Sequence, residues 1–245
     1  MKGSALLSGL VMLEAYFNQT FGMYKNNVDR YVVPSQFYID KLVEWGFPRE
    51  QFVHIPNYVE LDEQPSLEVG DYFVFAGRLA TGKGVKTLIR AAARQRARVV
   101  IAGTGPEEAE AKQLAAELGA QQVEFAGYLN KVDLKALVAG SRAIIVPSEW
   151  YENCPMSIIE AFAGGKPVIG SDVGGISEMI DEGEDGFKFE MGSEQVLAEK
   201  MEQVQSLSPS QLLAMGQNAI NKVKTRYSKS NYREKTLALY DELML

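Results

Sequence analysis

Residues 72–84 read YFVFAGRLATGKG, and a helical pattern opens directly after them at Val85. A short apolar run that leads into a glycine-rich loop and then into a helix is typical of a βα unit in a parallel sheet. Such a loop frees backbone N–H groups at the helix start, where the helix dipole favours an anion. Arg78 and Lys83 add two cations to the loop that begins at Gly77, so this segment is a candidate cradle for a diphosphate.

The same loop comes close to the phosphate-binding pattern G-x4-G-K-[ST] of P-loop NTPases. Gly84 stands where that pattern requires the hydroxyl that binds magnesium. In addition, the apolar run that ends at Val146 leads to Pro147 rather than to an aspartate that could hold the ion. A degenerate P-loop NTPase is therefore a weaker alternative for this loop, and a surface turn with solvated cations is another.

Apolar runs and amphipathic stretches alternate on both sides of this unit. The predicted strands are Arg30–Val33, Phe52–Ile55, Tyr72–Ala76, Arg98–Ala102, Val123–Phe125, Ala143–Val146, Pro167–Gly170 and Phe187–Phe189. The predicted helices between them are Gln36–Trp45, Val85–Arg94, Pro106–Leu118, Val132–Ala139, Pro155–Phe162 and Ile176–Asp181. This alternation indicates βαβ units with right-handed crossovers, and the nearly continuous apolar strands indicate a sheet covered on both faces. We therefore expect an α/β fold with a Rossmann-like parallel sheet of about six strands, helices on both faces, and a small helical and βαβ unit besides.

Two changes of pattern indicate domain boundaries. Residues 57–70 form a polar stretch without helical period, which we interpret as an interdomain linker. After Phe189 the pattern is wholly helical, and the predicted helices are Ser193–Gln205, Ser208–Arg226 and Lys229–Met244. We expect three parts, namely a partial first domain over residues 1–60, a Rossmann-like domain over 61–227, and a C-terminal helix over 228–245 that returns to the first part.

The first residues predict an amphipathic helix rather than a signal peptide, because Glu14 interrupts the apolar run and no small-residue cleavage site follows it. Large apolar side chains recur there at helical spacing, at Leu6, Leu10, Leu13, Phe17 and Phe21. We expect this helix and the apolar face of Leu237–Leu245 to pack on the small βαβ unit. The other members of that satellite core are expected to be Val32, Phe37, Leu42 and Phe52. A sheet this small leaves an edge open, which favours self-association.

Composition excludes several classes of function. The chain has 245 residues with 25 Lys and Arg against 32 Asp and Glu, so its formal net charge is −7. An acidic chain of this kind disfavours a broad nucleic-acid footprint. The single cysteine, Cys154, fits a reducing compartment and so predicts a cytoplasmic location. The single histidine, His54, argues against a multi-ligand zinc site.

A second candidate site lies in residues 148–161, SEWYENCPMSIIEA, at the carboxyl end of a predicted strand. Open α/β sheets bind their ligands at that end. We expect Pro155 to be the first helical residue, with Asn153 or Cys154 at the cap and the next N–H groups free. Because Cys154 has no adjacent base, a thiol nucleophile has little support.

Two glutamates of this segment can serve a ligand with vicinal hydroxyls. Glu152 lies outside the predicted helix and Glu160 lies inside it, so the loop must fold Glu152 back over the helix end. A carboxylate there can accept two hydrogen bonds from a ribose or a hexose. The alternative is an acid that tunes the helix dipole, followed by an exposed helix glutamate. Two further segments are weaker signals. Residues 125–129 could place a backbone edge or an aromatic ring against a base, and the alternative is that the aromatic residue belongs to the core. Residues 181–185 are interpreted as a solvated acidic turn.

Together these segments resemble the retaining glycosyltransferases of family 4, which have the two-domain GT-B fold. The motifs follow the family's order and spacing over about residues 29–227. They are Val33-Pro34-Ser35-Gln36-Phe37, His54-Ile55-Pro56-Asn57, Gly77-Arg78-Leu79 with Lys83-Gly84, Ala102-Gly103-Thr104-Gly105-Pro106, Phe125-Ala126-Gly127, the E-x7-E pair Glu152 and Glu160, Gly165-Lys166-Pro167-Val168-Ile169 and Gly174-Gly175-Ile176-Ser177-Glu178.

This resemblance implies a UDP- or GDP-sugar as donor substrate, with no metal ion and no cofactor. By the resemblance, Arg78 and Lys83 neutralise the diphosphate as it leaves, and Glu152, the third catalytic residue, holds hydroxyls of the donor sugar. Glu160 is implied to bind the ribose. The other implied donor-site residues are Gly77 in the first loop, Gly127, Tyr128 and Leu129 beside the base, and Asn153, Cys154, Pro155 and Met156, where N–H groups meet phosphate or sugar oxygens.

The chain departs from the family at its first domain, because only about 58 residues precede the linker. The resemblance therefore implies the back portion of a longer hexosyltransferase, whose missing first domain binds a carbohydrate or lipid-linked acceptor. It also implies a location in the cytoplasm or at the inner face of the membrane. A nucleotide-sugar-binding module without turnover is the alternative from another class.

Overall fold

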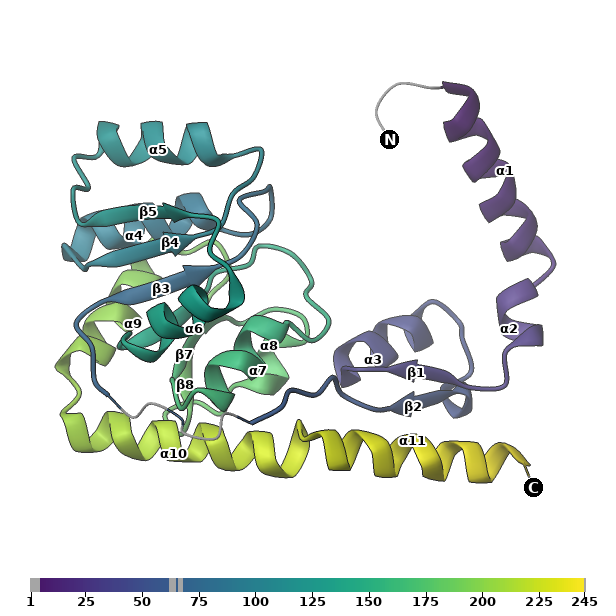
Figure 1. Cartoon of the computed structure of the whole chain (residues 1–245). Coiled ribbons are helices and arrows are strands. Elements are labelled where there is room, and N and C mark those ends of the chain that lie inside the picture. Colours follow the sequence, from purple (N-terminus) through teal and green to yellow (C-terminus); the bar gives the residue numbers. More distant parts are fainter. Residues whose placement is uncertain (1–4, 62–64, 66–67, 245) are drawn as a thin grey trace.

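The computed structural model describes residues 5–61, 65 and 68–244 and contains a large and a small parallel sheet (Figure 1). The strands of the large sheet are β3 (Phe73–Ala76), β4 (Val99–Ala102), β5 (Val123–Gly127), β6 (Ala143–Val146), β7 (Val168–Ser171) and β8 (Gly186–Phe189). Their order is β5-β4-β3-β6-β7-β8, and every pair is parallel. The predicted α/β fold with a six-stranded parallel sheet is confirmed.

Strand β3 lies between β4 and β6, so the order of the strands reverses at this point. The first crossover, through α4 (Val85–Gln95), leads to β4 on one side, and the chain later returns to place β6 on the other side. Loops that leave two adjacent strands in opposite directions open a crevice at the carboxyl ends of those strands. In this fold that point lies between the loop after β3 and the loop after β6.

Helices cover both faces of the large sheet. One face packs against α4, α5 (Glu108–Glu117) and α9 (Glu194–Ser206), and the other packs against α6 (Lys131–Ala139), α7 (Met156–Ala163), α8 (Ile176–Met179) and α10 (Pro209–Arg226). Alternate residues of one strand serve the two cores: Phe73 and Phe75 point to the first, whereas Val74 points to the second. All three are buried, which explains why the strand is apolar at every position.

The small unit, residues 30–58, contains β1 (Tyr31–Val33), α3 (Gln36–Glu44), the 3₁₀ turn η1 (Arg49–Gln51) and β2 (Phe52–His54). Helix α11 (Lys229–Met244) continues from α10 and runs along this unit (Figure 1). The rings of Tyr58 and Tyr232 lie 4.8 Å apart, and Arg30 forms an ion pair of 2.7 Å with Glu242. The chain passes between the two units near Val59 and again near Tyr227. These two segments are adjacent, because Val59 N donates to Tyr227 O at 3.0 Å.

The expected packing of the N-terminal helix is wrong. Helix α1 (Ala5–Thr20) forms, but it stands away from the small unit and packs mainly on the short helix α2 (Met23–Asn27) (Figure 1). Leu10, Leu13 and Phe17 are each more than half exposed. The sheet of the small unit packs against α3 instead, and α11 contributes Leu239 as its one buried side chain among the described residues. Of the remaining expected members of the satellite core, Val32 is 48% exposed, whereas the side chain of Leu6 and residue Leu245 lie outside the described residues.

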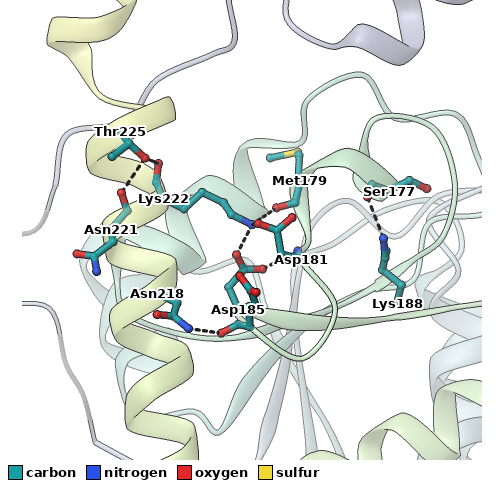
Figure 2. A network of polar contacts seen from close by, with 10 residues as sticks. Ser177, Met179, Asp181, Asp185, Lys188, Asn218, Asn221, Lys222 and Thr225 are labelled. Atoms are coloured by element: carbon teal, nitrogen blue, oxygen red, sulfur yellow. Dashed lines mark hydrogen bonds and ion pairs between the residues drawn. The ribbon is translucent and has the colours of Figure 1, made fainter.

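Helix α10 is attached to the large sheet by a buried charge network (Figure 2). Lys222 as a residue is only 8% exposed, and its ammonium lies against the carboxylates of Asp181 and Asp185 and donates to Met179 O at 2.9 Å. The hydrogen bond from Lys222 lowers the pKa of Asp181. Reading residues 181–185 as a solvated turn is therefore wrong for Asp185, which is 1% exposed.

The eight predicted strands are all present, and their ends differ from the prediction by at most two residues. Helix α2 and the turn η1 were not predicted, because neither contains a full period of apolar residues. Within the part of the chain that the structure describes, no helix is both long enough and apolar enough to cross a bilayer.

Candidate functional site

The loop after β3 is held by the loop after β4. Beyond the strand ends, Gly77 N donates to Ala102 O and Leu79 N donates to Thr104 O, both at 3.0 Å. Gly103, at φ 140°, lies so close to Gly77 that an added Cβ would overlap the carbonyl oxygen of that residue. Close backbone approach between neighbouring loops therefore explains the glycine at position 103.

Gly84 brings the loop after β3 against the loop after β6. It is the N-cap of α4 with φ 70°, and an added Cβ would overlap the carbonyl oxygen of Pro147. No side chain fits here, so the hydroxyl that a P-loop carries at this position has no place. The same two loops are joined by Glu149, whose N–H donates to Gly82 O at 2.7 Å and whose carboxylate accepts from Thr87 Oγ1 at 2.5 Å.

Lys83 and Glu152 meet in the crevice between these loops. Lys83 Nζ lies 2.6 Å from Glu152 Oε1, and Ser148 Oγ donates to the same oxygen at 3.0 Å. The side chain of Glu152 is 17% exposed and that of Lys83 is 39% exposed. The structure thus brings together one cation from the glycine-rich loop and one carboxylate from the second candidate segment, at the crevice that the topology defines.

Arg78 lies in the same loop but points into solvent. Its side chain is exposed, as is Gly77, and within the described residues it forms no hydrogen bond or ion pair. Its guanidinium is therefore free to bind an anion at the carboxyl end of β3.

The segment from Asn153 to Met156 begins α7 one residue later than predicted. Pro155 is the N-cap, in an extended conformation (φ −63°, ψ 121°), and Met156 is the first helical residue. Asn153 Oδ1 accepts from Ser35 Oγ at 2.5 Å, and Cys154 O accepts from Asn57 Nδ2 at 3.2 Å. These contacts hold the segment against the small unit.

Burial raises the pKa of the Cys154 thiol to about 11. A thiol with this pKa stays protonated at neutral pH, so it is no nucleophile.

Glu160 lies on α7, apart from the ion pair. Burial among the surrounding groups raises the pKa of its carboxyl, and the nearby Lys131 opposes this rise. The residue is nevertheless exposed to solvent, and its side chain forms no hydrogen bond within the described part of the chain. The structure therefore links Lys83 to Glu152 but shows no direct contact between Glu160 and either of them.

Residues 127–129 lie at the carboxyl end of the edge strand β5. Gly127 has φ 67° and accepts a hydrogen bond from Gly103 N at 2.7 Å, so this segment borders the loop after β4. The ring of Tyr128 is 79% exposed, and Leu129 is half-buried. An exposed ring beside a free backbone edge can stack on a planar group.

A cavity of about 440 Å³ opens at the junction of the two units rather than at this crevice. It is lined by Pro34, His54, Pro56, Glu178, Met179, Thr225, Arg226, Tyr227, Asn231 and Lys235. None of the residues predicted for the donor site lines it. Among the described residues, no three His, Cys, Asp or Glu side chains gather in a way that could hold a metal ion.

Sequence reasoning missed several residues that position the crevice. Ser148 and Glu149 directly follow the strand β6, and this place at a strand's carboxyl end is a signal that could have identified them. Thr87 carries no comparable signal. Ser35 and Asn57 belong to the motifs of the family resemblance, but their contacts depend on how separate segments meet.

Known proteins match both the sequence and the fold. Residues 60–222 match the model of the family described as glycosyl transferases group 1. The D-rhamnosyltransferase WbpZ of Pseudomonas aeruginosa is 31% identical over 230 residues, covering 88% of this chain and 60% of the relative. The alpha-D-kanosaminyltransferase of Streptomyces kanamyceticus is 26% identical over 192 residues, which cover 76% of this chain and 49% of the relative. The chain spans about half the length of the curated relatives it matches.

Two solved structures are similar in fold. Alr3699/HepE of Anabaena, in complex with UDP, matches with a TM-score of 0.80 and 21% sequence identity. The match covers 87% of this chain and 64% of the Anabaena chain. A glycosyltransferase from Rickettsia africae matches with a TM-score of 0.80 and 22% sequence identity, over 92% of this chain and 67% of the Rickettsia chain. These neighbours have the GT-B fold, and the family match extends over about two thirds of the chain. The chain therefore belongs to the glycosyl transferases group 1 family.

Proposed function

We propose that this chain is the donor-binding part of a retaining glycosyltransferase of family 4. Its donor is a UDP- or GDP-sugar, and its acceptor is a carbohydrate or a lipid-linked saccharide. The observation that carries the proposal is the meeting of Lys83 and Glu152 at the switch point of the sheet, 2.6 Å apart. A cation for phosphate and a carboxylate for hydroxyls, side by side, suit a sugar esterified to a diphosphate.

The two cations act on the diphosphate. When the bond from the anomeric carbon to the diphosphate oxygen breaks, negative charge grows on that oxygen, and Arg78 and Lys83 stabilise it. Arg78 has no partner in the described chain and contributes its full charge, whereas Lys83 must exchange part of its contact with Glu152 for phosphate. Because these side chains supply the positive charge, the proposed reaction requires no metal ion.

The two carboxylates act on hydroxyl groups. Glu152 accepts hydrogen bonds from the donor sugar, held at one oxygen by Ser148, and Glu160 accepts from the ribose. The acceptor hydroxyl attacks the anomeric carbon from the side that the diphosphate leaves, its proton passes to the leaving phosphate oxygen, and no protein nucleophile takes part. Tyr128 and its neighbours flank the base, and the first turn of α7 offers N–H groups to oxygens of the donor.

A module that binds the donor without turnover is the second candidate. Donor binding is expected under both candidates, and only sugar transfer or hydrolysis separates them. The solved neighbour that contains UDP supports a uridine nucleotide as the first ligand to test.

The test is calorimetric titration of the chain with UDP, GDP, UDP-glucose and GDP-mannose. At one hundred times the dissociation constant, a ligand should stabilise the fold by about 2.7 kcal/mol, which a thermal shift detects independently. Release of free UDP or GDP from the sugar nucleotide then decides between enzyme and binding module. If none of the four ligands binds, the proposal is wrong.

A further inference from the structure

Glu178 is a carboxylate of the large unit, and within the described residues its side-chain hydrogen-bond partners all belong to the small unit. It lies on α8, and its Oε1 and Oε2 accept hydrogen bonds from Gln36 N at 2.9 and 3.1 Å. Oε2 also accepts from Phe37 N at 3.2 Å. These N–H groups belong to the first turn of α3, where the helix dipole stabilises a negative charge. One side chain thus attaches α8 to the start of α3.

Helix α8 is in turn held against the donor loop. Gly175 N donates to Glu152 O at 2.7 Å. Gly174, at φ 59°, leaves so little space that an added Cβ would lie 2.7 Å from the same oxygen. At Gly175 an added Cβ would overlap the carbonyl oxygen of Asn153. The turn before α8 and residues 151–154 therefore fit together without room for a side chain.

The small unit also forms direct hydrogen bonds with residues 151–154. Ser35, the N-cap of α3, accepts from Tyr38 N at 3.3 Å and donates to Asn153 Oδ1 at 2.5 Å. Tyr38 Oη donates to Tyr151 O at 3.4 Å, and Asn57 Nδ2 donates to Cys154 O at 3.2 Å. The side chain of Glu152, in the same segment, points toward Lys83 and Ser148.

We infer that Glu178 is a positioning residue of the donor site: together with Ser35 it clamps residues 151–154 between α3 and α8, and so fixes where Glu152 meets the donor sugar. The inference rests on the proposed function for the nature of the ligand, but the clamp itself is a property of the chain. It makes the small unit part of the donor site's geometry without contact to the donor.

The first experiment measures hydrogen exchange of the amides of residues 149–154. Glu178→Gln keeps the shape of the side chain and removes its charge, and Ser35→Ala removes the second contact from the opposite side of the interface. Exchange should accelerate about fivefold in each variant, as expected for the loss of a helix cap. Glu184→Gln is the matched control, because its side chain is exposed and forms no hydrogen bond within the described residues. Unchanged exchange in both clamp variants overturns the inference.

The second experiment compares the affinities for UDP and UDP-glucose. Loss of a positioning contact for Glu152 should weaken UDP-glucose about fivefold relative to UDP, whereas general destabilisation would weaken both alike. An unchanged ratio in Glu178→Gln and Ser35→Ala also overturns the inference. If the wild-type chain binds neither ligand, the proposed function fails, and the exchange measurement alone decides on the clamp.

Discussion

Lys83 and Glu152 are 69 positions apart in the chain, yet their side chains form an ion pair of 2.6 Å between the loops that follow β3 and β6. Since Lys83 is 39% exposed, solvent screens the pair and its net contribution to folding is small. Both residues nevertheless occupy the crevice at the switch point of the sheet. The role that we propose for the pair is therefore ligand binding rather than stability.

Lys83→Met should therefore change binding more than stability. We expect the affinity for UDP to fall about 10- to 100-fold, since a charge-assisted contact to phosphate is lost. The free energy of unfolding should change by less than about 1 kcal/mol. Calorimetry and urea denaturation measure the two effects. The control is Lys224→Met, an exposed lysine of α10. Strong destabilisation with unchanged UDP affinity would contradict the proposed role.

The sequence could predict this meeting because the carboxyl ends of parallel strands share one edge of a sheet. Apolar runs such as the one from Phe73 to Ala76 identify strands that are buried on both faces. The glycines after such runs identify loops that bind a ligand or lie close to the backbone of a neighbouring loop. The pairing of Lys83 with Glu152 needed only the further inference that β3 and β6 are neighbours.

Contacts between separately folded segments could not be predicted in this way. Glu178 ends a motif of the family resemblance, but only the placement of α3 reveals its two hydrogen-bond partners. Asp185 reads as a solvated acid until α10 brings Lys222 beside it. Helix α1 has the apolar period of a packed helix, but its partner surface is not supplied by the small unit. Periodicity shows that a face is apolar and does not show what covers it.

Glu160→Gln should raise stability at neutral pH and weaken nucleotide binding. Burial raises the pKa of Glu160 above its ordinary value of 4.5, so ionisation is less favourable in the folded state than in the unfolded state. This penalty is absent below the unfolded-state pKa and complete above the raised folded-state pKa. The melting temperature of the variant should therefore exceed that of the wild type at pH 7, and the difference should vanish as the pH falls below 4.5.

Thermal unfolding at several pH values checks the first effect, and titration with UDP checks the second. The control is Glu190→Gln, an exposed glutamate without a side-chain hydrogen bond in the described chain. A variant that binds UDP as tightly as the wild type would exclude Glu160 from the ribose site.

Lys222→Met should destabilise the chain strongly. The substitution leaves Asp185, 1% exposed, without its cation, and breaking a buried pair from one side costs about 3–5 kcal/mol. The double variant Lys222→Met with Asp185→Asn should recover much of this loss, because no buried charge is then left alone. Urea denaturation measures both. Equal stability of the single variant and the wild type would mean that water solvates the network shown in Figure 2.

Self-association should increase with concentration. The small sheet has two strands, and each leaves one edge unpaired within the described residues. The exposed side chains of α1 add a second apolar surface. Sedimentation over a range of concentrations tests the expectation. Leu10→Gln with Leu13→Gln removes the contribution of α1, and Val32→Lys places a charge on β1. A monomer at every concentration in the wild-type chain would rule out both surfaces as contacts.

Gly84→Ala should damage both the fold and donor binding, and Gly119→Ala separates the two causes. Both glycines have a left-handed backbone, with φ 70° and 61°, so alanine at either position is strained by about 1–2 kcal/mol. Nothing lies within 4 Å of an added Cβ at Gly119, whereas at Gly84 the Cβ would overlap Pro147 O. The loop after β3 must then move away from the loop after β6, which separates Lys83 from Glu152. We expect Gly84→Ala to lose measurably more stability than Gly119→Ala in urea denaturation. We also expect it alone to lose affinity for UDP-glucose, and equal affinities in the two variants would show that the donor site does not depend on the contact between these loops.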